Sequence, residues 1–349
     1  MVLTSSVRKL MDRAARRFGY RLVPQSLLDL YQIDDGAGLA PASLNTGATA
    51  ESAAYLRRGN PRLLELRALF AGLDPALKTP PLWTEEYASQ TDLTSFRGHS
   101  AWVWQQGNPG LHERAYLLAA YYVLAHDRLG LMEKLTEDGT FGAIAYEIAG
   151  RQISRDLLDS ILEIDFLDRH LSIASRPPLS VLDIGAGYGR LAHRMLAAIP
   201  SLGNYLCADA IPESSFVCEY YLRFRGLEGR FKIVPATEID AALDLEHVDL
   251  AINIHSFSEC SLDAVEWWMG RLAARAVKHF MMVPNACGHD GDLLRNNAGA
   301  DMLPLIERSG YRLVAKEPKY SDPKVQKLAL NPTWFWLFER SDVAGSSAD

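Results

Sequence analysis

VLDIGAGYGRL, residues 181–191, is the stretch that decides the fold of this chain. It begins as a short apolar strand, passes through Gly185, Gly187 and Gly189, and continues into a segment with helical spacing of its apolar residues. Glycine allows the backbone to turn sharply and to approach a ligand without a Cβ clash. The stretch therefore predicts a strand, a turn that binds a ligand, and a helix. The alternative is a tight turn that binds nothing.

Two details of this turn favour S-adenosylmethionine over a dinucleotide. The glycines are spaced G-x-G-x-G rather than G-x-G-x-x-G, and Asp183 precedes the first of them by two residues. A pyrophosphate gains little from a carboxylate at that place, whereas a ligand with an ammonium and a sulfonium group is attracted by it. We therefore expect Asp183, Gly185, Ala186 and Gly187 to bind S-adenosylmethionine. A nicotinamide oxidoreductase is the less favoured alternative.

Short apolar runs alternate with helical ones on the C-terminal side of residue 175. They predict an α/β fold over residues 176–340: a Rossmann-like, seven-stranded and mostly parallel sheet with helices on both faces. The expected strands are 179–184, 205–209, 231–234, 248–254, 279–283, 311–315 and 334–338. The last two have no obvious helix between them, which predicts an antiparallel pair at the sheet edge. Residues 341–349 are mostly small and polar and predict a flexible tail.

The first half of the chain has a different pattern. Apolar residues recur at helical spacing over three stretches, 55–73, 112–127 and 153–170. This predicts a mainly α-helical N-terminal domain over residues 1–175, and we expect it to form a lid over the acceptor site. Pro177 and Pro178 mark its boundary, because proline cannot continue a helix. The basic segment 7–18 predicts a helix docked on the protein, with contact to a membrane surface as the alternative.

Carboxylates and other polar residues follow the next two predicted strands. Asp209 ends the strand after the glycine turn, where a carboxylate accepts hydrogen bonds from ribose hydroxyls. Its alternative role is a helix cap. Ala210 follows it, and Thr237 and Glu238 follow the third strand, where a methyltransferase commonly holds adenine. We therefore expect all four residues to contact the cofactor.

Over residues 178–340 the chain resembles the class I S-adenosylmethionine-dependent methyltransferases, through the turn at 183–189 and the carboxylate that follows it. Within that class it is similar to a family of sugar O-methyltransferases, through INIHSFSEC at 252–260 and, more weakly, GRQISRDLL at 150–158. Cys260 stands where that family carries methionine. The resemblance implies methylation of a saccharide hydroxyl, such as one on a precursor of a polymethylated or capped polysaccharide.

Methyl transfer to a hydroxyl needs a base, and the segment after the fourth predicted strand supplies one. His255 is the expected base, because an imidazole with an ordinary pKa of roughly 6.5 takes up a proton near neutral pH. We expect Glu259 to orient His255 or the sugar, and Asn253 to face the amino-acid end of the cofactor. The alternatives are a core or capping histidine and a helix-end carboxylate.

Two further groups are candidates for acceptor binding. His289 and Asp290 lie in a polar loop after the fifth predicted strand, on the ligand side of the sheet, with an ordinary surface loop as the alternative. Trp102 and Trp104 suit the apolar face of a sugar, with core packing as the alternative. Carboxylates in this loop would favour magnesium, but no ligand spacing defines a site. No metal-binding residue is assigned, and a divalent cation stays open as a cofactor.

The composition limits the partners. The formal net charge of −7 disfavours nonspecific nucleic-acid binding, which needs an excess of Lys and Arg. Four cysteines without CxxC spacing, and no secretory signal pattern, predict a cytoplasmic protein. We expect a small-molecule saccharide acceptor, no nucleic acid, no stable membrane insertion, and a homodimer as one option. The competing functions are O-methylation of a non-sugar small molecule and partner binding by a non-catalytic methyltransferase fold.

Overall fold

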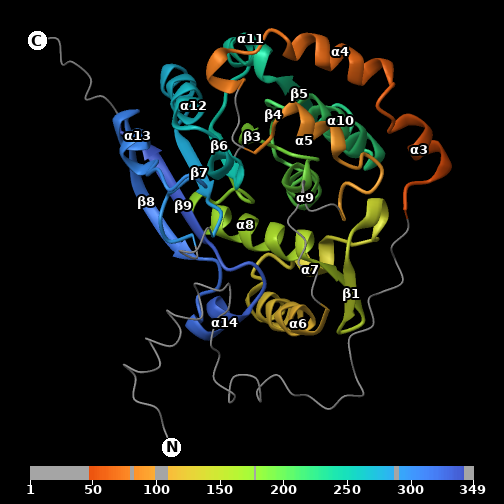
Figure 1. Cartoon of the computed structure of the whole chain (residues 1–349). Helices are drawn as coiled ribbons and strands as arrows, with labels where there is room; N and C mark the ends of the chain where they lie inside the picture. Colours follow the sequence, from red (N-terminus) through yellow and green to blue (C-terminus); the bar gives the residue numbers. More distant parts are fainter. Residues whose placement is uncertain (1–46, 79–81, 99–108, 177, 287–290, 342–349) are drawn as a thin grey trace, which may run out of the picture.

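The computed structural model describes residues 47–78, 82–98, 109–176, 178–286 and 291–341. Its centre is a seven-stranded sheet with helices around it, which confirms the predicted α/β fold (Figure 1). Each strand of this sheet falls on one of the seven expected runs. The strands are β3 (Val181–Ile184), β4 (Tyr205–Asp209), β5 (Phe231–Pro235), β6 (Leu250–Ile254), β7 (His279–Val283), β8 (Tyr311–Pro318) and β9 (Trp334–Arg340).

The strand order places the glycine turn at the middle of the sheet. The strands follow the order β5-β4-β3-β6-β7-β9-β8, so the chain adds strands to one side of β3 and then to the other. β3 is parallel to both of its neighbours, β4 and β6. Open α/β sheets bind ligands at the carboxyl ends of the strands where this reversal occurs. The turn after β3 therefore opens where ligands bind.

The last two strands form the predicted antiparallel pair. β9 is antiparallel to both β7 and β8, and β8 lies at the edge of the sheet. The apolar pattern indicated no helix between them, but α14 (Pro323–Leu328) is there. Asp322 caps this helix by accepting from the backbone N–H groups of Lys324 and Val325, and Pro323 takes its first position. Local capping, rather than apolar periodicity, forms this helix.

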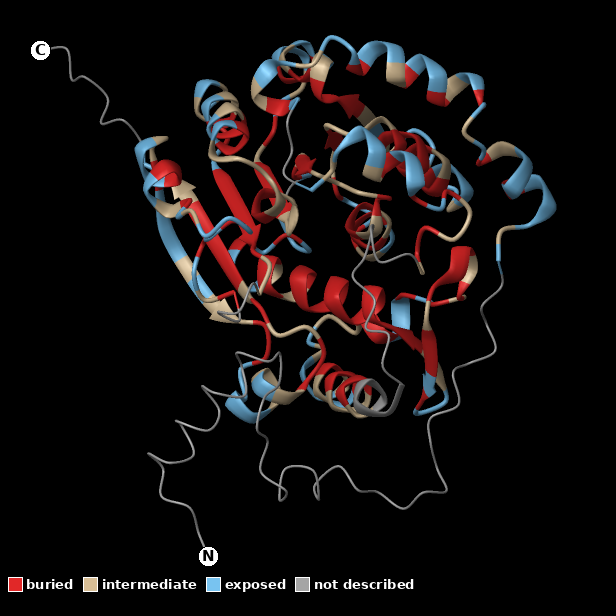
Figure 2. Ribbon diagram, viewed as in Figure 1, coloured by how far each residue is buried: buried red, intermediate tan, exposed pale blue. Residues whose placement is uncertain are grey.

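Helices cover both faces of the sheet. Successive side chains of a strand point to opposite faces, so apolar strand residues form a core on each side. On one face, Val181 and Cys207 share a core with α8 (Arg155–Leu171), α9 (Arg190–Ala198) and α10 (Pro212–Phe224). On the other face, Leu182 and Leu206 share a core with α11 (Ile239–Leu245), α12 (Leu262–Ala274) and α13 (Leu303–Arg308). The central strands are buried on both faces (Figure 2). This accounts for their nearly continuous apolar sequences.

The described part of the first half is mostly helical. Its elements are α3 (Ala50–Tyr55), α4 (Pro61–Phe70), α5 (Glu85–Gln90), α6 (Pro109–His126), α7 (Leu131–Lys134) and a hairpin of β1 (Ala145–Ile148) and β2 (Arg151–Ser154). The single helix expected over 55–73 is wrong, because the chain breaks at Asn60, whose side chain caps α4, and Pro61 starts that helix. None of the helices in the described ranges is long and apolar enough to cross a membrane.

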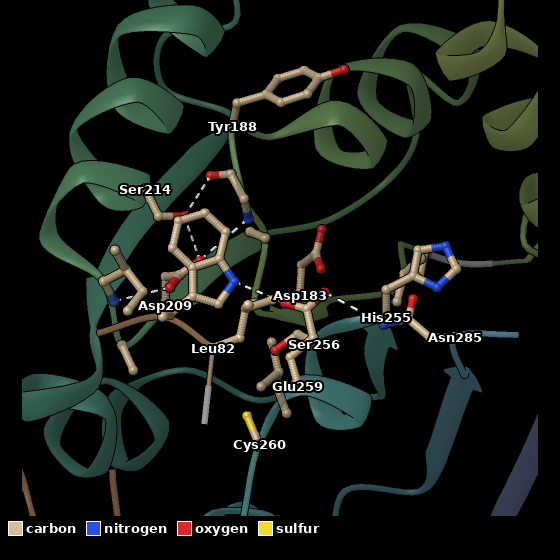
Figure 3. Close-up of a pocket in the computed structure, with 18 of the residues that line it drawn as sticks. Leu82, Asp183, Tyr188, Asp209, Ser214, His255, Ser256, Glu259, Cys260 and Asn285 are labelled. Carbon is tan, nitrogen blue, oxygen red and sulfur yellow. Dashed lines mark hydrogen bonds between the residues drawn. The ribbon is translucent and has the colours of Figure 1, made fainter. Parts of the chain in front are cut away.

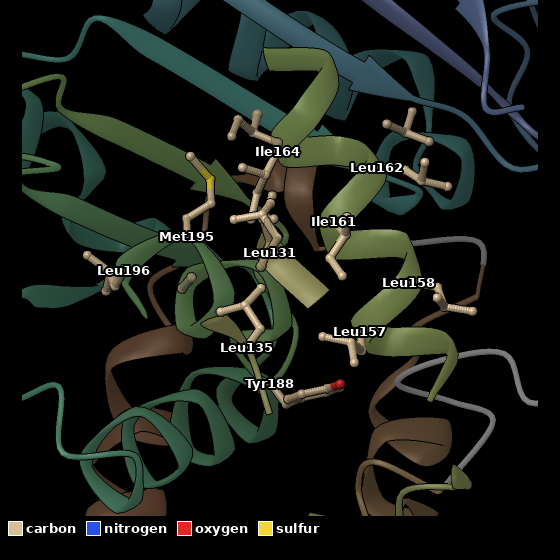
Figure 4. Packing of buried hydrophobic residues seen from close by; sticks show 14 of the residues in the cluster. Leu131, Leu135, Leu157, Leu158, Ile161, Leu162, Ile164, Tyr188, Met195 and Leu196 are labelled. Carbon is tan, nitrogen blue, oxygen red and sulfur yellow. The ribbon is translucent and has the colours of Figure 1, made fainter. Parts of the chain in front are cut away.

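Helix α8 joins the first half of the chain to the sheet. Its residues Leu157, Ile161 and Ile164 are buried in one cluster with Met195 and Leu196 of α9 (Figure 4). α6 also packs against α8, so that α8 lies between α6 and α9 (Figure 1). One apolar core thus continues across the boundary expected near residue 175. The division into domains at that residue stays a prediction.

Buried charges connect the same elements next to the glycine turn. Arg97 is fully buried, and its guanidinium lies 2.7 Å from Glu137 and 3.5 Å from Asp156. Arg194 of α9 lies 3.1 Å from the same Glu137. Tyr188, inside the glycine turn, donates its hydroxyl to Asp156. Buried charged residues of the first half therefore fix the glycine turn and the start of α9 in place.

Candidate functional site

A cavity of about 660 Å³ lies where the carboxyl ends of β3, β4, β6 and β7 meet (Figure 3). Small-molecule sites typically measure roughly 300–1,000 Å³. The glycine turn forms one wall, and the loops after β6 and β7 form another. The first half of the chain supplies a third wall, made of Ala76, Leu77, Leu82, Trp83 and Tyr87. The cavity has the size and position of a ligand site.

The glycines of the turn all have a left-handed backbone, with φ of +74° at Gly185, +59° at Gly187 and +84° at Gly189. A Cβ on Gly185 would lie 2.3 Å from Oγ of Ser256, so a side chain there would collide with the loop after β6. A Cβ on Gly187 would meet nothing within 4 Å, and Gly187 lines the cavity, as Ala186 does. Gly185 is therefore needed for packing, and Gly187 keeps the ligand side of the turn open.

Asp209 ends β4 at one end of the cavity and fixes the glycine turn. It accepts from the backbone N–H groups of Ile211 at 3.0 Å and Gly187 at 3.3 Å, and from the Ser214 hydroxyl at 2.5 Å. The backbone N–H of Ala210 also acts on this carboxylate, so the protein itself supplies about as many donors as the carboxylate has lone-pair sites. Burial raises the pKa of Asp209 to about 6, against the effect of these donors. Asp209 thus caps the start of the next segment and also lines the cavity beside Ala210.

Asp183 lies between Asp209 and His255 in the cavity wall (Figure 3). Tyr205 donates its hydroxyl to Oδ2 of Asp183 at 3.0 Å. Burial raises the pKa of Asp183 to about 7, against the effect of this hydrogen bond. A cation bound beside the carboxyl group would favour its charged form. Asp183 is therefore suited to face a positively charged part of a ligand.

Glu259 is the third carboxylate of the cavity and ends the short 3-10 turn Ser256–Glu259 after β6. It accepts from the indole N–H of Trp83 at 2.8 Å and from the side-chain amide of Asn285 at 3.4 Å. Burial raises the pKa of Glu259, against the effect of these two donors. Its bond to Trp83 attaches the first half of the chain to the cavity. Within the described ranges, no group of three or more His, Cys, Asp or Glu residues is placed to hold a metal ion.

His255 begins the loop after β6, across the cavity from Asp209 (Figure 3). Its φ is +66°, which side-chain-bearing residues seldom adopt, and its backbone N–H donates to the carbonyl of Val283 at 2.7 Å. Its Nδ1 atom is buried and has no hydrogen-bond partner in the described structure. Burial lowers the pKa of His255 to about 3, and the cations Arg155 and Arg190 lower it further. The imidazole is therefore neutral near pH 7, and a pKa of about 3 makes it a weak proton acceptor until a bound group raises that value.

Three residues predicted to bind the cofactor do not line the cavity. Asn253 is fully buried, donates to the carbonyl of Ile184 at 2.9 Å and accepts from the N–H of Phe257 at 2.9 Å. It therefore ties the loops after β3 and β6 to each other. Thr237 and Glu238 lie in a short 3-10 turn after β5. The predicted acceptor residues lie outside the described residues: Trp102, Trp104, His289 and Asp290.

The cavity also contains residues to which the sequence pattern gave no role: Ser214, Arg155, Trp83, Asn285 and Asn331. Ser214 could have been found, because it lies in the first turn of α10, just after the carboxylate that it contacts. Arg155 belongs to the segment of weaker family resemblance at 150–158. No local signal marks Trp83 or Asn331, which come from distant parts of the chain and meet at the cavity only through folding.

Several solved structures are similar to part of this chain. An S-adenosylmethionine-dependent methyltransferase from Clostridium acetobutylicum ATCC 824 is 14% identical with a TM-score of 0.39, over 52% of this chain and 90% of that one. The magnesium protoporphyrin IX methyltransferase ChlM from Synechocystis PCC 6803, with bound S-adenosylmethionine, is 12% identical with a TM-score of 0.37, over 54% and 83%. The [4+2]-cyclase SpnF is 13% identical with a TM-score of 0.39, over 64% and 94%. No protein-family model matches the chain, and neither does any curated protein.

Proposed function

We propose that this protein is a methyltransferase that uses S-adenosylmethionine. The observation that carries this function is the set of carboxylates in the cavity wall, where Asp183, Asp209 and Glu259 lie around a glycine turn. Carboxylates attract the sulfonium and ammonium cations of this cofactor and repel the pyrophosphate of a dinucleotide. The G-x-G-x-G spacing of the turn supports the same choice.

The residues present fit this cofactor. Asp209 lines the cavity at the end of β4, where a ribose hydroxyl would share its oxygens with the backbone donors, and Ser214 beside it is a second polar group at that end. Gly187 leaves room for the cofactor to lie against the turn, since a Cβ there would meet only open space. Asp183 would face the ammonium group. The cofactor supplies a methyl group on a positively charged sulfur, which makes the methyl carbon open to attack by an oxygen.

The acceptor hydroxyl would lie between the cofactor and His255. His255 follows β6 and Asp209 ends β4, two strand positions away, so about 10 Å separates these strand ends and leaves room for an acceptor. When the acceptor oxygen takes the methyl group, its hydroxyl proton would move to the neutral His255 ring. Glu259 would hold Trp83 over the cavity, which excludes water during the transfer.

We infer that the acceptor is a saccharide, as the resemblance of residues 252–260 to sugar O-methyltransferases implies. Trp83, Tyr87 and Trp268 line the cavity and offer apolar ring faces, which suit the flat faces of sugar rings. Asn285 adds a polar side chain at the same wall, which suits sugar hydroxyls. A non-sugar alcohol or phenol is the second candidate and is included in the test.

Calorimetry with S-adenosylhomocysteine, S-adenosylmethionine and NAD tests the cofactor. We expect micromolar binding of the two sulfur compounds and no binding of NAD, and the opposite result would overturn the proposal. Methyl transfer is then measured with a panel of saccharides and phenols. Methylated saccharides would support the sugar acceptor, whereas methylation of phenols alone would replace it.

Two variants test the assigned roles separately. Asp209→Asn should weaken S-adenosylhomocysteine binding at least about tenfold, as expected for a lost charge-assisted hydrogen bond, with Asp240→Asn at the protein surface as the control. His255→Asn keeps a side chain that tolerates the left-handed backbone but removes the base. It should leave cofactor affinity unchanged and lower kcat by about 10²–10⁴-fold. Near-normal turnover would exclude His255 as the base.

A further inference from the structure

The half of the cavity away from Asp209 contains polar groups that the cofactor site does not use. Nδ1 of His255 and Nδ2 of Asn331 are both buried, and neither has a hydrogen-bond partner in the described structure. Both residues line the cavity and have a left-handed backbone, with φ of +66° and +47°. An unsatisfied buried polar group destabilises the folded protein. Two such groups in one cavity point to a ligand that supplies the missing bonds.

Buried ion pairs hold these groups in position. Lys319 donates to the Asp159 carboxylate and to the backbone carbonyls of Leu330 at 3.2 Å and Asn331 at 3.3 Å. Arg155, at the start of α8, donates to the same Asp159 at 3.1 Å and lines the cavity. Asp159 therefore links the loop that carries Asn331 to the helix that carries Arg155. The polar groups are fixed before a ligand enters.

Cations predominate among the charges that act on the imidazole of His255. The cations that act on the buried imidazole are Arg155, Arg190 and Lys319. Glu163 compensates Arg190, and Asp159 is shared between Arg155 and Lys319. Of the charges that act most strongly on His255, three are cations and one, Asp159, is a carboxylate. This excess attracts an anion into this half of the cavity.

We propose that Arg155, Asn331 and His255 form a subsite that binds a carboxylate carried by the methyl acceptor. This inference rests on the proposed function, because the ligand is taken to be the acceptor. His255 follows β6 and Asn331 precedes β9, on the opposite side of β3 from Asp209. The amide of Asn331 and an Nδ1–H of His255 can each donate to a carboxylate oxygen, beside a guanidinium. The acceptor class is a hydroxyl compound with an acid group, such as a uronic acid.

A bound carboxylate would also change the strength of the base. Burial and the nearby cations lower the pKa of His255 to about 3. An anion next to Nδ1 favours the imidazolium form and therefore raises this pKa. The other ring nitrogen, which then carries the lone pair, becomes a better proton acceptor. An acidic acceptor is thus expected to be methylated faster than its neutral counterpart, in addition to binding more tightly.

The experiment compares matched acids and neutral compounds on the full chain saturated with S-adenosylhomocysteine. The probes are D-glucuronate with D-glucose and 3,4-dihydroxybenzoate with catechol, titrated by calorimetry. We expect each acid to bind at least about tenfold more tightly than its partner, as for charge-assisted hydrogen bonds. Asn331→Gly, in which glycine adopts the same backbone freely, and Arg155→Gln should each reduce this ratio below about threefold. Arg128→Gln, in an exposed ion pair, is the matched control.

An NMR titration of His255 is the second readout, because a purely structural role of Asn331 would not affect it. The pKa of His255 should rise when D-glucuronate is bound and stay unchanged with D-glucose. Equal affinity within both pairs, or no binding of either acid, would overturn the subsite. Asn331→Gly could instead weaken S-adenosylhomocysteine binding about tenfold and leave the ratio of acid to neutral affinity unchanged. Arg155, Asn331 and His255 would then bind the carboxylate of the cofactor, and the acceptor subsite would be refuted.

Failure of the proposed function gives a different result. The unaltered protein would then not bind S-adenosylhomocysteine at all. The same acid and neutral pairs would be titrated without it, and a preference for the acids that Asn331→Gly removes would support the subsite alone. Absence of that preference would refute the subsite together with the function.

Discussion

Two single-methyl substitutions in the glycine turn separate packing from ligand access. Gly185→Ala and Gly187→Ala both place a Cβ on a residue with positive φ, which costs an alanine roughly 1–2 kcal/mol. Only the first also places that Cβ 2.3 Å from Oγ and 2.4 Å from Cβ of Ser256. Overpacking of this kind costs about 1–3 kcal/mol. The free energy of unfolding should therefore fall by about 2–5 kcal/mol for Gly185→Ala and by about 1–2 kcal/mol for Gly187→Ala.

Urea unfolding and calorimetry with S-adenosylhomocysteine measure the two effects. Gly187→Ala should bind the cofactor product at least about tenfold more weakly despite its smaller loss of stability, because its methyl group occupies the ligand side of the turn. Ser256→Gly removes both atoms involved in the other collision. The double variant Gly185→Ala/Ser256→Gly should regain the free energy of unfolding lost to overpacking, about 1–3 kcal/mol. The loss due to the positive φ of residue 185 should remain. Equal losses in the two single variants, or no recovery in the double variant, would refute this reasoning.

Three further predictions concern Asp183, Trp83 and Arg97. The pKa of Asp183 is raised from 3.8 to about 7, so the folded protein holds a proton that the unfolded chain releases, and this contribution to stability is lost as the pH rises from about 4 to 7. Between pH 5 and 7, the free energy of unfolding in urea should fall by on the order of 2–3 kcal/mol more in the unaltered protein than in Asp183→Asn. An equal fall in both proteins would contradict the assignment. Trp83→Phe removes the indole donor to Glu259 and should weaken S-adenosylhomocysteine binding about tenfold in calorimetry; an unchanged affinity would show that this contact does not close the cavity. Arg97→Met leaves buried carboxylates without their cation and should cost about 3–5 kcal/mol in urea unfolding, against less than about 1 kcal/mol for the exposed Arg128→Met, and equal losses would argue against a buried network.

The parts of the fold that were predicted correctly depend on local patterns. The run at 279–283 is short and mostly apolar because β7 is buried on both faces, so the strand can be recognised without knowing its neighbours. The helix expected over 55–73 failed although a local signal was present. Asn60 followed by Pro61 is the pattern of a helix start, and it competes with the apolar periodicity that runs through it.

The site was predictable only where its residues follow a strand directly. Asp209 was found because it ends β4, and the glycines were found because their spacing is distinctive. Asn253 lies near the end of β6, but its side-chain amide forms hydrogen bonds with the backbone of Ile184 and Phe257 instead of facing the cavity. This orientation depends on how the loops after β3 and β6 are placed relative to each other, which no local pattern shows. Trp83 reaches Glu259 from a segment far away in the sequence, so no local pattern marks it.

The ion pairs between the two halves of the chain have a consequence for the evolution of relatives. Carboxylates of the first half neutralise cations of the second, and the reverse also occurs; the pairs are Glu163–Arg190, Glu137–Arg194, Asp159–Lys319, Arg62–Glu219 and Arg67–Glu213. A chimaera of the first half of one relative and the second half of another would leave the charges of the first three, buried pairs without counterparts, at a cost of several kcal/mol each. New acceptor specificity would therefore arise by point substitutions in the cavity wall, or by recombination that transfers both halves together.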